Sequence, residues 1–310
     1  MIDNYVRMFG SQPKQYVSPL EKGDHPELDT SDELDMDGIK KYQSIIGSLQ
    51  WTISLGRFDI GTAVMTLSSF RVAPKEGHMK RACRIVGYLS KMRDATIRYR
   101  VERPDYSDLP VENYSWDHSV YGEVTEEIPT DIPELLGNTI DTTTYVDANL
   151  LHDLITGRST GIIHLFNKTP GDWFTKKQNT VETSTFGSEF VAARTATEQI
   201  MDLRLTLRYM GVPVGRSIMF GDNESVIKNS TLPNSRLMKR HMALSYHRVR
   251  EAIVAKILSF HHIPGKENPA DILSKHWGYQ QIWDLLRPLL FWKGDTKDCI
   301  NYDVNQDKGE

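Results

Sequence analysis

Hydrophobic residues between Ile39 and Tyr99 recur at steps of three and four, which is the spacing of one face of an α-helix. Pro74 separates the earlier part of this series from a third helical stretch, which runs from Gly77 to about Asp94. We therefore expect a small helical domain over residues 39–103. Its buried face is expected to hold Tyr42, Ile45, Ile46, Leu49, Ile53, Ile60, Val64 and Leu67.

The hydrophobic period changes from helical to alternating beyond residue 140. Segments 142–149, 160–167 and 172–178 are rich in β-branched and aromatic residues, and they predict three antiparallel strands. A long helix is expected over residues 183–210, with Ser184 or Thr185 as its N-cap and Gly211 as its stop. Further elements are a strand at 217–220, a short helix after Asp222, a basic helix from about Met238 to Ala255, a strand at 257–263 and a last helix opened by Asn268 and Pro269.

This succession of three strands, a helix, a strand, helices, a strand and a helix is the order of a ribonuclease H-like fold. We expect an α/β chain in which a five-stranded mixed sheet with flanking helices occupies residues 141–278. The small helical domain precedes it, and a C-terminal helix and tail follow over residues 279–310.

Two acidic segments interrupt the hydrophobic pattern. Residues 20–38 hold few large apolar side chains and predict a linker or a mobile surface arm that follows residues 1–19. Residues 104–140 contain nine acidic residues and no lysine or arginine, with four prolines. They predict a second linker, longer than the first.

Basic residues gather in two other stretches, although the net charge of the 310-residue chain is −4. Eight lysines and arginines lie between Lys80 and Arg103, against two acids, and a second basic stretch extends from Arg236 to Lys256. Such runs are usually solvated faces, but their local density also suits a phosphate-facing surface. The hydrophobic pattern shows no export signal and no span long enough for a membrane. We expect a soluble intracellular protein, cytoplasmic or nuclear.

Four acids stand at places where the predicted elements meet one edge of the sheet. Asp147 comes late in the first strand, Asp222 follows the fourth, Glu189 lies early in the long helix, and Asp271 opens the last helix. An acid at any one of these places is more often a turn former or an N-cap than a ligand. Four together predict hard oxygen ligands for two Mg²⁺ ions, with Mn²⁺ as an alternative, at a phosphodiester-cleaving site.

A polymerase site is not expected in this chain. A reverse transcriptase palm needs two adjacent aspartates for its metal ions, whereas Asp147 is followed by Ala148 and the sequence contains no Asp-Asp pair.

The motifs resemble the C-terminal part of the Pol polyprotein of copia-type retrotransposons. Residues 42–70 are similar to the helical segment that follows the polymerase palm, and Phe9-Gly10 and Ser18-Pro19-Leu20 are similar to the end of that palm. In the second half, the segments YVDAN, GRST, SEFVAA, GDNES, RHMALSYHRVRE and NPADILSK occur in the order of the family's ribonuclease H.

The resemblance implies that Asp147, Glu189, Asp222 and Asp271 are the metal-binding acids. It also implies an RNA/DNA hybrid substrate, cut on the RNA strand to leave a 3′-hydroxyl and a 5′-phosphate. A polymerase segment is expected as a partner in cis or in trans, and the oligomeric state is not assigned.

Additional residues are candidates for contact with the hybrid. His241 or His247 lies where related enzymes place a mobile histidine that helps the product leave, and either is also compatible with a surface or capping role. Lys176, Lys177 and Gln178 either contact the hybrid or form an exposed strand end. The expected nucleic-acid contacts are Lys176, Lys177, Gln178, Asn223, Arg240, Arg248 and Arg250, with His241 as the assisting histidine.

Three functions fit these observations. The first is an active hybrid ribonuclease that works beside a polymerase, and the second is a non-catalytic nucleic-acid-binding remnant of a truncated element. The third is another nuclease of the same fold, such as an integrase or a proofreading exonuclease. The presence of all four acids favours the first, and the order of the flanking motifs disfavours the third.

Overall fold

The computed structural model describes residues 1–21, 23–110, 114–117, 119–153, 157–178, 184–237, 239–275 and 279–290. Three parts of the prediction lie outside the described residues: the first residue of the long helix, residue 183, the first residue of the basic helix, Met238, and the tail 291–310.

The N-terminal third is helical. It contains α1 (Ile2–Phe9), α2 (Met36–Ser54), α3 (Gly61–Ser68) and α4 (Glu76–Lys91), with short 3-10 turns at Pro26–Leu28 and Phe58–Ile60. The Asp35 carboxylate caps α2 by accepting a hydrogen bond from the Gly38 amide. The residues predicted for the buried face of this helical domain are at most 3% exposed, with the exception of Ile53. Ile53 is partly buried and packs against the same core.

A five-stranded sheet forms the second half. Its strands are β1 (Ile140–Asp153), β2 (Gly157–Phe166), β3 (Thr169–Lys177), β4 (Val214–Gly221) and β5 (Ser259–His262), in the spatial order β3-β2-β1-β4-β5. The first three pair antiparallel, whereas β4 pairs parallel with β1 and with β5. The connecting helices are α5 (Thr185–Tyr209), α6 (Glu224–Thr231), α7 (Ala243–Val254), α8 (Asp271–Ser274) and α9 (Tyr279–Leu290). This arrangement confirms the predicted ribonuclease H-like fold.

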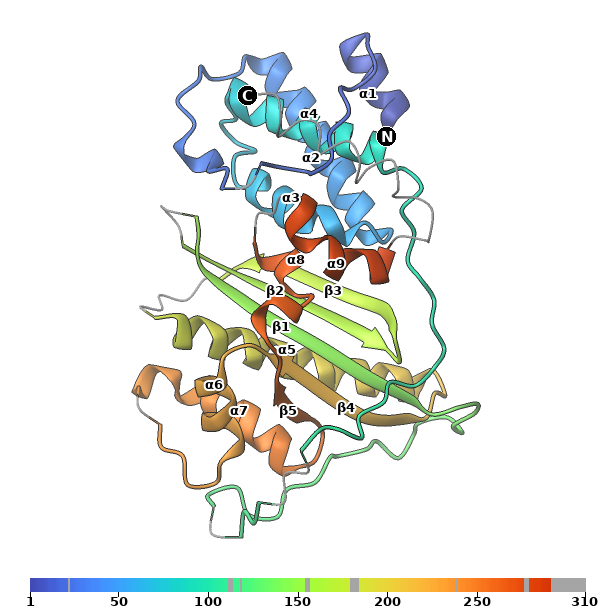
Figure 1. Ribbon diagram of the computed structural model, residues 1–310, viewed down its shortest axis with the longest axis vertical. Coiled ribbons are helices and arrows are strands. Elements are labelled where there is room, and N and C mark those ends of the chain that lie inside the picture. Colours follow the sequence, from blue (N-terminus) through green and yellow to red (C-terminus); the bar gives the residue numbers. More distant parts are fainter. Residues whose placement is uncertain are drawn as a thin grey trace.

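The sheet is covered on both faces, and strand β2 shows the alternation that this requires. Ile162 points to the face covered by α5, and Ile163 points to the opposite face, where it joins the core of the helical region. Both side chains are fully buried. In Figure 1, α8 and α9 lie between the sheet and helices α1–α4, while α5 crosses the other face. The helical region also meets the sheet directly, because the rings of Phe58 and of Trp173 in β3 lie 5.3 Å apart.

The predicted mobile arm at residues 20–38 is instead packed against α4. Arg81 forms ion pairs with Asp24 and Asp29, and Arg84 pairs with Glu21. Gly77 allows this approach, because a Cβ at that position would lie 1.8 Å from an Asp29 carboxylate oxygen. The interpretation of this segment as a mobile arm was wrong, since Glu21, Asp24 and Asp29 pair with arginines of α4. Part of the first basic stretch is consequently neutralised within the chain.

The second acidic segment runs along the outside of the sheet domain, from the helical region past β4 and around α7 (Figure 1). Between residues 101 and 139 it contains no helix or strand among the residues described. Glu126 anchors it, because its carboxylate accepts hydrogen bonds from both Arg204 and Arg208 of α5. No helix within the described ranges is both long and apolar enough to cross a membrane.

Candidate active site

Three carboxylates converge at the edge of the sheet. Asp147 of β1, Glu189 of α5 and Asp222, which directly follows β4, each offer an oxygen that lies within 4.8 Å of the others. Asp147 is 1% exposed and Glu189 is 7% exposed. Acids buried so closely together are rare unless they are paired or bind a cation.

Strand register brings two of these acids together. Tyr145 of β1 pairs with Phe220 of β4 in parallel register, so Asp147 and Asp222, each two residues further along, emerge side by side. Glu189 comes from the opposite side of the site. Ser184 caps α5 by accepting a hydrogen bond from the Gly187 amide, which fixes the start of the helix that carries Glu189.

The electrostatics of the three acids fit a cation site. Burial, followed by the charges of Asp147 and Asp222, raises the pKa of Glu189 well above its ordinary value. Burial and the charge of Asp147 also raise the pKa of Asp222. Both shifts arise because negative charges are held together away from water. A divalent cation bound by their oxygens would relieve this repulsion, and carboxylate oxygens are the ligands that Mg²⁺ and Mn²⁺ prefer.

Asp271 occupies a different position from the other three acids. Its carboxylate accepts a hydrogen bond from Lys275 Nζ at 2.6 Å, and the same Nζ lies 3.4 Å from Asp147 Oδ2. Burial, followed by the charge of Asp147, raises the pKa of Asp271 to about 6, although Lys275 opposes this shift. The structure thus brings three of the predicted acids into direct proximity and connects the fourth to Asp147 through a lysine.

Helix α8 carries Asp271 and is only four residues long, so most of its backbone carbonyls have no partner within the helix. Hydroxyl groups from three other elements satisfy them. Thr62 of α3 donates to the Ile272 carbonyl at 3.1 Å, Thr175 of β3 to the Leu273 carbonyl at 2.7 Å, and Ser159 of β2 to the Ser274 carbonyl at 2.7 Å. We call Thr62, Ser159 and Thr175 the hydroxyl clamp. It ties the helical region, through Thr62, to the helix that carries Asp271.

Strand β2 also allows α8 to approach closely. A Cβ on Gly161, the residue opposite Asp147 in β2, would lie 2.7 Å from the Ala270 carbonyl oxygen. On the other side, Asn268 Nδ2 donates to the Val146 carbonyl at 2.9 Å. The start of α8 is therefore held against β1 and β2, next to the acid on β1.

The sequence interpretation missed two residues of the site, Ser274 and Lys275. The Ser274 hydroxyl donates a short hydrogen bond to Asp147 Oδ2. Both residues lie in the segment NPADILSK, three and four positions after Asp271, which is the spacing of neighbours on one helix face. That spacing was the signal available in the sequence.

The carboxylates line an open hollow of about 640 Å³. Asn223 and His262 also line it, and the Asn223 side chain caps α6 by accepting hydrogen bonds from the Ser225 and Val226 amides. Asn223 is thus one of the residues that line the hollow. Of the described residues that line the hollow, Lys275 is the only lysine or arginine.

The predicted contacts on β3 differ from one another. Lys176 is exposed and Lys177 is half-buried near the end of the strand. Gln178 instead points inward, where its amide donates to Thr160 Oγ1 at 2.8 Å and to the Ser188 carbonyl at 2.9 Å. Gln178 thereby joins the sheet to the first turns of α5, beside Glu189.

Arg250 was wrongly predicted to contact nucleic acid. Its side chain is 2% exposed, and its guanidinium donates to the backbone carbonyls of Asn229, Leu232 and Pro233. The rings of Trp116, Tyr121 and Tyr246 surround the same group. Arg250 stabilises the interior around α7 and has no surface to offer to a phosphate.

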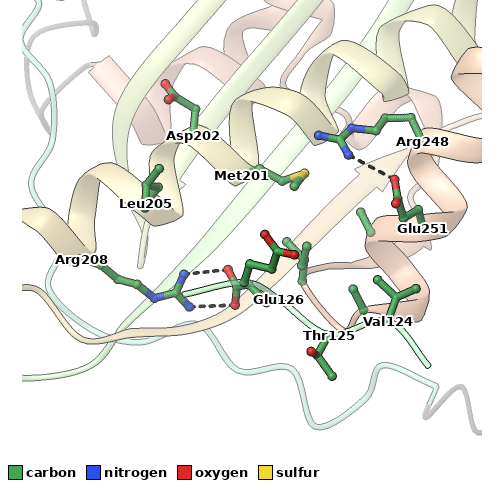
Figure 2. A pocket seen from close by; sticks show the side chains of 13 residues that line it. Val124, Thr125, Glu126, Met201, Asp202, Leu205, Arg208, Arg248 and Glu251 are labelled. Carbon is green, nitrogen blue, oxygen red and sulfur yellow. Dashed lines mark hydrogen bonds and ion pairs between the residues drawn. The ribbon is translucent and has the colours of Figure 1, made fainter. Parts of the chain in front are cut away.

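Arg248 lies apart from the carboxylates. It pairs with Glu251 and lines a second pocket, of about 500 Å³, between α5, α7 and residues 124–127 (Figure 2). Glu126 and Arg208 also line this pocket and form the ion pair drawn in Figure 2. None of the converging carboxylates lines it. Arg248 therefore does not reach the candidate active site.

His241 and Arg240 are exposed in a 3-10 turn, Arg240–Met242, that precedes α7. The neighbouring Lys239 Nζ donates to Ser184 Oγ at 2.8 Å, and Ser184 caps the helix that carries Glu189. The turn is therefore attached near the start of α5. His247 is more remote in its contacts, because its Nδ1 lies 2.7 Å from the hydroxyl of Tyr121 in the acidic segment.

Comparisons with known proteins place the chain beside transposon proteins. No protein-family model matches it. It is 26% identical over 235 residues to the retrovirus-related Pol polyprotein from transposon TNT 1-94 of Nicotiana tabacum, which covers 76% of this chain and 15% of the polyprotein. It is 25% identical over 237 residues to the polyprotein from transposon RE1 of Arabidopsis thaliana, which covers 76% of this chain and 14% of that protein. The chain thus spans about one seventh of the length of these relatives.

Solved structures with similarity to the chain include ribonucleases H. The N-terminal ribonuclease H domain of a Mycobacterium tuberculosis protein has 10% identity and a TM-score of 0.35, and it covers 44% of this chain and 91% of that one. LC11-RNase H1 in complex with an RNA/DNA hybrid has 15% identity and a TM-score of 0.34, covering 43% and 93%. These scores are low, and the fold is established by the strand order and connections of the chain itself. The similarity to Pol polyproteins over about three quarters of the chain confirms the resemblance inferred from its motifs.

Proposed function

We propose that the chain is a metal-dependent ribonuclease H that cuts the RNA strand of RNA/DNA hybrids. The observation that carries this proposal is the convergence of Asp147, Glu189 and Asp222 on one another at an open hollow. The similarity to retrotransposon Pol polyproteins supports the choice of a hybrid substrate. A polymerase segment, in the same polyprotein or in a separate chain, would supply the hybrid.

The fit between acids and cation supports the metal dependence. Asp147 and Glu189 are buried and Asp222 is half-buried beside them, and the pKa values of Glu189 and Asp222 are raised, so the site carries charge repulsion that a cation or protons would relieve. Two bound divalent ions would activate a water molecule and stabilise the leaving oxygen. Asp147 is the central residue, because it contacts both the acidic group and the Lys275 and Ser274 pair.

The remaining residues of the hollow would hold the substrate. Asn223 and His262 stand at its rim, and exposed Lys176, together with Arg240, offers cations for phosphate contacts. Such contacts position a duplex without reading its sequence. In the reaction, water adds to phosphorus and the bond to the 3′ oxygen breaks. The products are a 3′-hydroxyl and a 5′-phosphate.

A cleavage assay tests the proposal. Purified chain is incubated with an end-labelled RNA/DNA hybrid, with magnesium or with chelator, beside Asp147→Asn and the control Asp172→Asn. Asp172 is an exposed acid of β3 whose carboxylate accepts a hydrogen bond from the next backbone amide. We expect magnesium-dependent cleavage by the wild type and by Asp172→Asn, and none by Asp147→Asn. Absence of cleavage by the wild type, or equal cleavage by all three proteins, would contradict the proposal; binding without cleavage would favour the non-catalytic remnant.

A further inference from the structure

Lys275 is placed where a cation would lie between two of the acids. Its Nζ is 2.6 Å from Asp271 Oδ1, 3.4 Å from Asp147 Oδ2 and 3.5 Å from Asp147 Oδ1. It therefore links Asp271, which lies outside the group of three converging acids, to Asp147, which belongs to that group. An ammonium group at these distances offsets one of the two carboxylate charges, whereas a divalent ion would offset both.

We propose that Lys275 occupies the cation position between Asp147 and Asp271 in the metal-free protein and that a divalent ion entering this position must displace it. Lys275 is then a positioning residue that sets the affinity of this second ion. Within the converging group Lys275 pairs with Asp147, so the position formed by Asp147, Glu189 and Asp222 should be affected less. The inference rests on the proposed metal-dependent function, and it adds that the Lys275 ammonium competes with the second divalent ion for its position.

The location of Lys275 makes displacement feasible. It is the residue that ends α8, and its side chain is 40% exposed, so it can turn toward solvent without opening the core. The backbone of α8 is held independently of Lys275, because the hydroxyl clamp bonds the carbonyls of Ile272, Leu273 and Ser274. The two carboxylates would therefore keep their places while the ammonium leaves.

The charge balance of the hollow supports competition. Asp147, Glu189 and Asp222 line it together with Lys275, and Asp271 is attached at its edge. Among the described residues that line it, Lys275 supplies the only lysine or arginine side chain. Loss of its positive charge would leave Asp147 and Asp271 facing each other with no counter-ion.

Metal binding measured without substrate tests the inference. Full-length wild type, Lys275→Met and Lys275→Arg are titrated with Mn²⁺ by calorimetry. We expect the second equivalent to bind Lys275→Met at least tenfold more tightly than the wild type, with a much smaller change for the first equivalent. Lys275→Arg, which keeps the charge, is expected to resemble the wild type.

Lys228→Met is the matched control. Lys228 pairs with Glu224 at the rim of the same hollow, with the same i, i+4 spacing that joins Asp271 and Lys275. Its removal changes the net charge equally but leaves the position between Asp147 and Asp271 untouched. We expect less than a threefold change in the affinity of the second ion.

Thermal melts supply an independent measurement. Metal-free Lys275→Met should melt below metal-free wild type, and saturating Mn²⁺ should close this gap, since the ion takes the place of the ammonium. If Lys275→Met is poorly folded, Lys275→Gln is titrated instead.

Two outcomes separate this inference from the proposed function. If the wild type binds Mn²⁺ but Lys275→Met binds the second ion no more tightly, competition by Lys275 is refuted and the metal-dependent function stands. If the wild type binds no divalent ion at all, the proposed function fails and this inference fails with it.

Discussion

Thr62 and Ile272 are 210 positions apart in the chain, yet the Thr62 hydroxyl donates a hydrogen bond to the Ile272 carbonyl at 3.1 Å. Both residues are buried. Ile272 directly follows Asp271, so the contact joins α3 of the helical region to the helix that carries a proposed metal-binding acid. The helical region is consequently part of the support of the site and not only a neighbour of the sheet domain.

Thr62→Val tests this support. The substitution keeps the shape of the side chain but leaves a buried carbonyl without its donor, which costs about 1–2 kcal/mol of unfolding free energy. We expect kcat for hybrid cleavage to fall about tenfold, because α8 loses one of three anchors, while KM changes little.

The control for Thr62 is Thr197→Val in α5. Thr197 is equally buried and its hydroxyl bonds within its own helix, to the Ala193 carbonyl. Urea unfolding and steady-state kinetics of both variants are compared. Equal losses of kcat at equal losses of stability would mean that Thr62 has a packing role only.

The stability of the metal-free protein should fall as pH rises. The pKa of Asp271 is raised from 3.8 to about 6, so between these values the folded chain binds a proton that the unfolded chain has released. Folding is therefore favoured at the acidic end of this window, and the contribution is lost as pH rises through about 6. The raised pKa of Glu189, which burial and the charges of Asp147 and Asp222 cause, acts in the same direction.

Melting temperatures in chelator from pH 4.5 to 7.5 measure this dependence. Asp271→Asn removes the Asp271 contribution and should show a flatter profile, with a relative gain of about 2 kcal/mol at neutral pH. Saturating magnesium should flatten the wild-type profile as well, because bound metal stabilises the ionised acids. Parallel profiles for the wild type and Asp271→Asn would show that the raised pKa of Asp271 does not cause the loss of stability with rising pH.

Glu126 provides the opposite pH dependence. Burial acts to raise its pKa, but hydrogen bonds from Arg204 and Arg208 hold that pKa at about 2, below the ordinary 4.5. The unfolded chain therefore binds a proton first as pH falls. The stabilisation is complete above about 4.5 and is lost as pH falls toward 2.

Glu126→Gln should destabilise the protein by about 2–3 kcal/mol at neutral pH, because two buried arginines lose their counter-ion. The difference from the wild type should shrink as pH falls below 4.5. Denaturant unfolding at pH 7 and pH 3 measures both values. Glu127→Gln, which changes an exposed neighbour, should have little effect, and an equal loss there would show that the ion pairs are not responsible.

Sequence patterns predicted the strands and the long helix because local periodicity encodes them, and the converging acids could be located because they stand at the ends of these elements. The hydroxyl clamp was missed because a hydroxyl that bonds a remote carbonyl leaves no periodic trace, whereas Lys275 was missed although its i, i+4 spacing from Asp271 is visible in the sequence. The pairing of the acidic segments with arginines was missed for a similar reason, since charge patterns do not specify partners. Arg250 was misassigned because the basic helix pattern did not show which of its cations faces inward.

Exposed and buried basic residues among the predicted nucleic-acid contacts should differ in how their removal changes the salt dependence of hybrid binding. Lys176 is exposed on β3, whereas Arg250 is buried among backbone carbonyls. Each phosphate contact releases counter-ions from the duplex, so its loss lowers the slope of log affinity against log salt by about 1. Lys176→Ala should show this reduction with unchanged melting temperature, measured on hybrid binding in the Asp147→Asn background.

Arg250→Ala should lower the stability of the protein and leave the salt dependence of hybrid binding unchanged. Three carbonyls would lose their donor and the aromatic cage its cation, so we expect a loss of about 3 kcal/mol of unfolding free energy. At a temperature where the variant is folded, its salt slope should equal that of the parent, because no phosphate contact is removed. A reduced slope for Arg250→Ala would show that the helix opens to bind the hybrid, and an unchanged slope for Lys176→Ala would remove β3 from the binding surface.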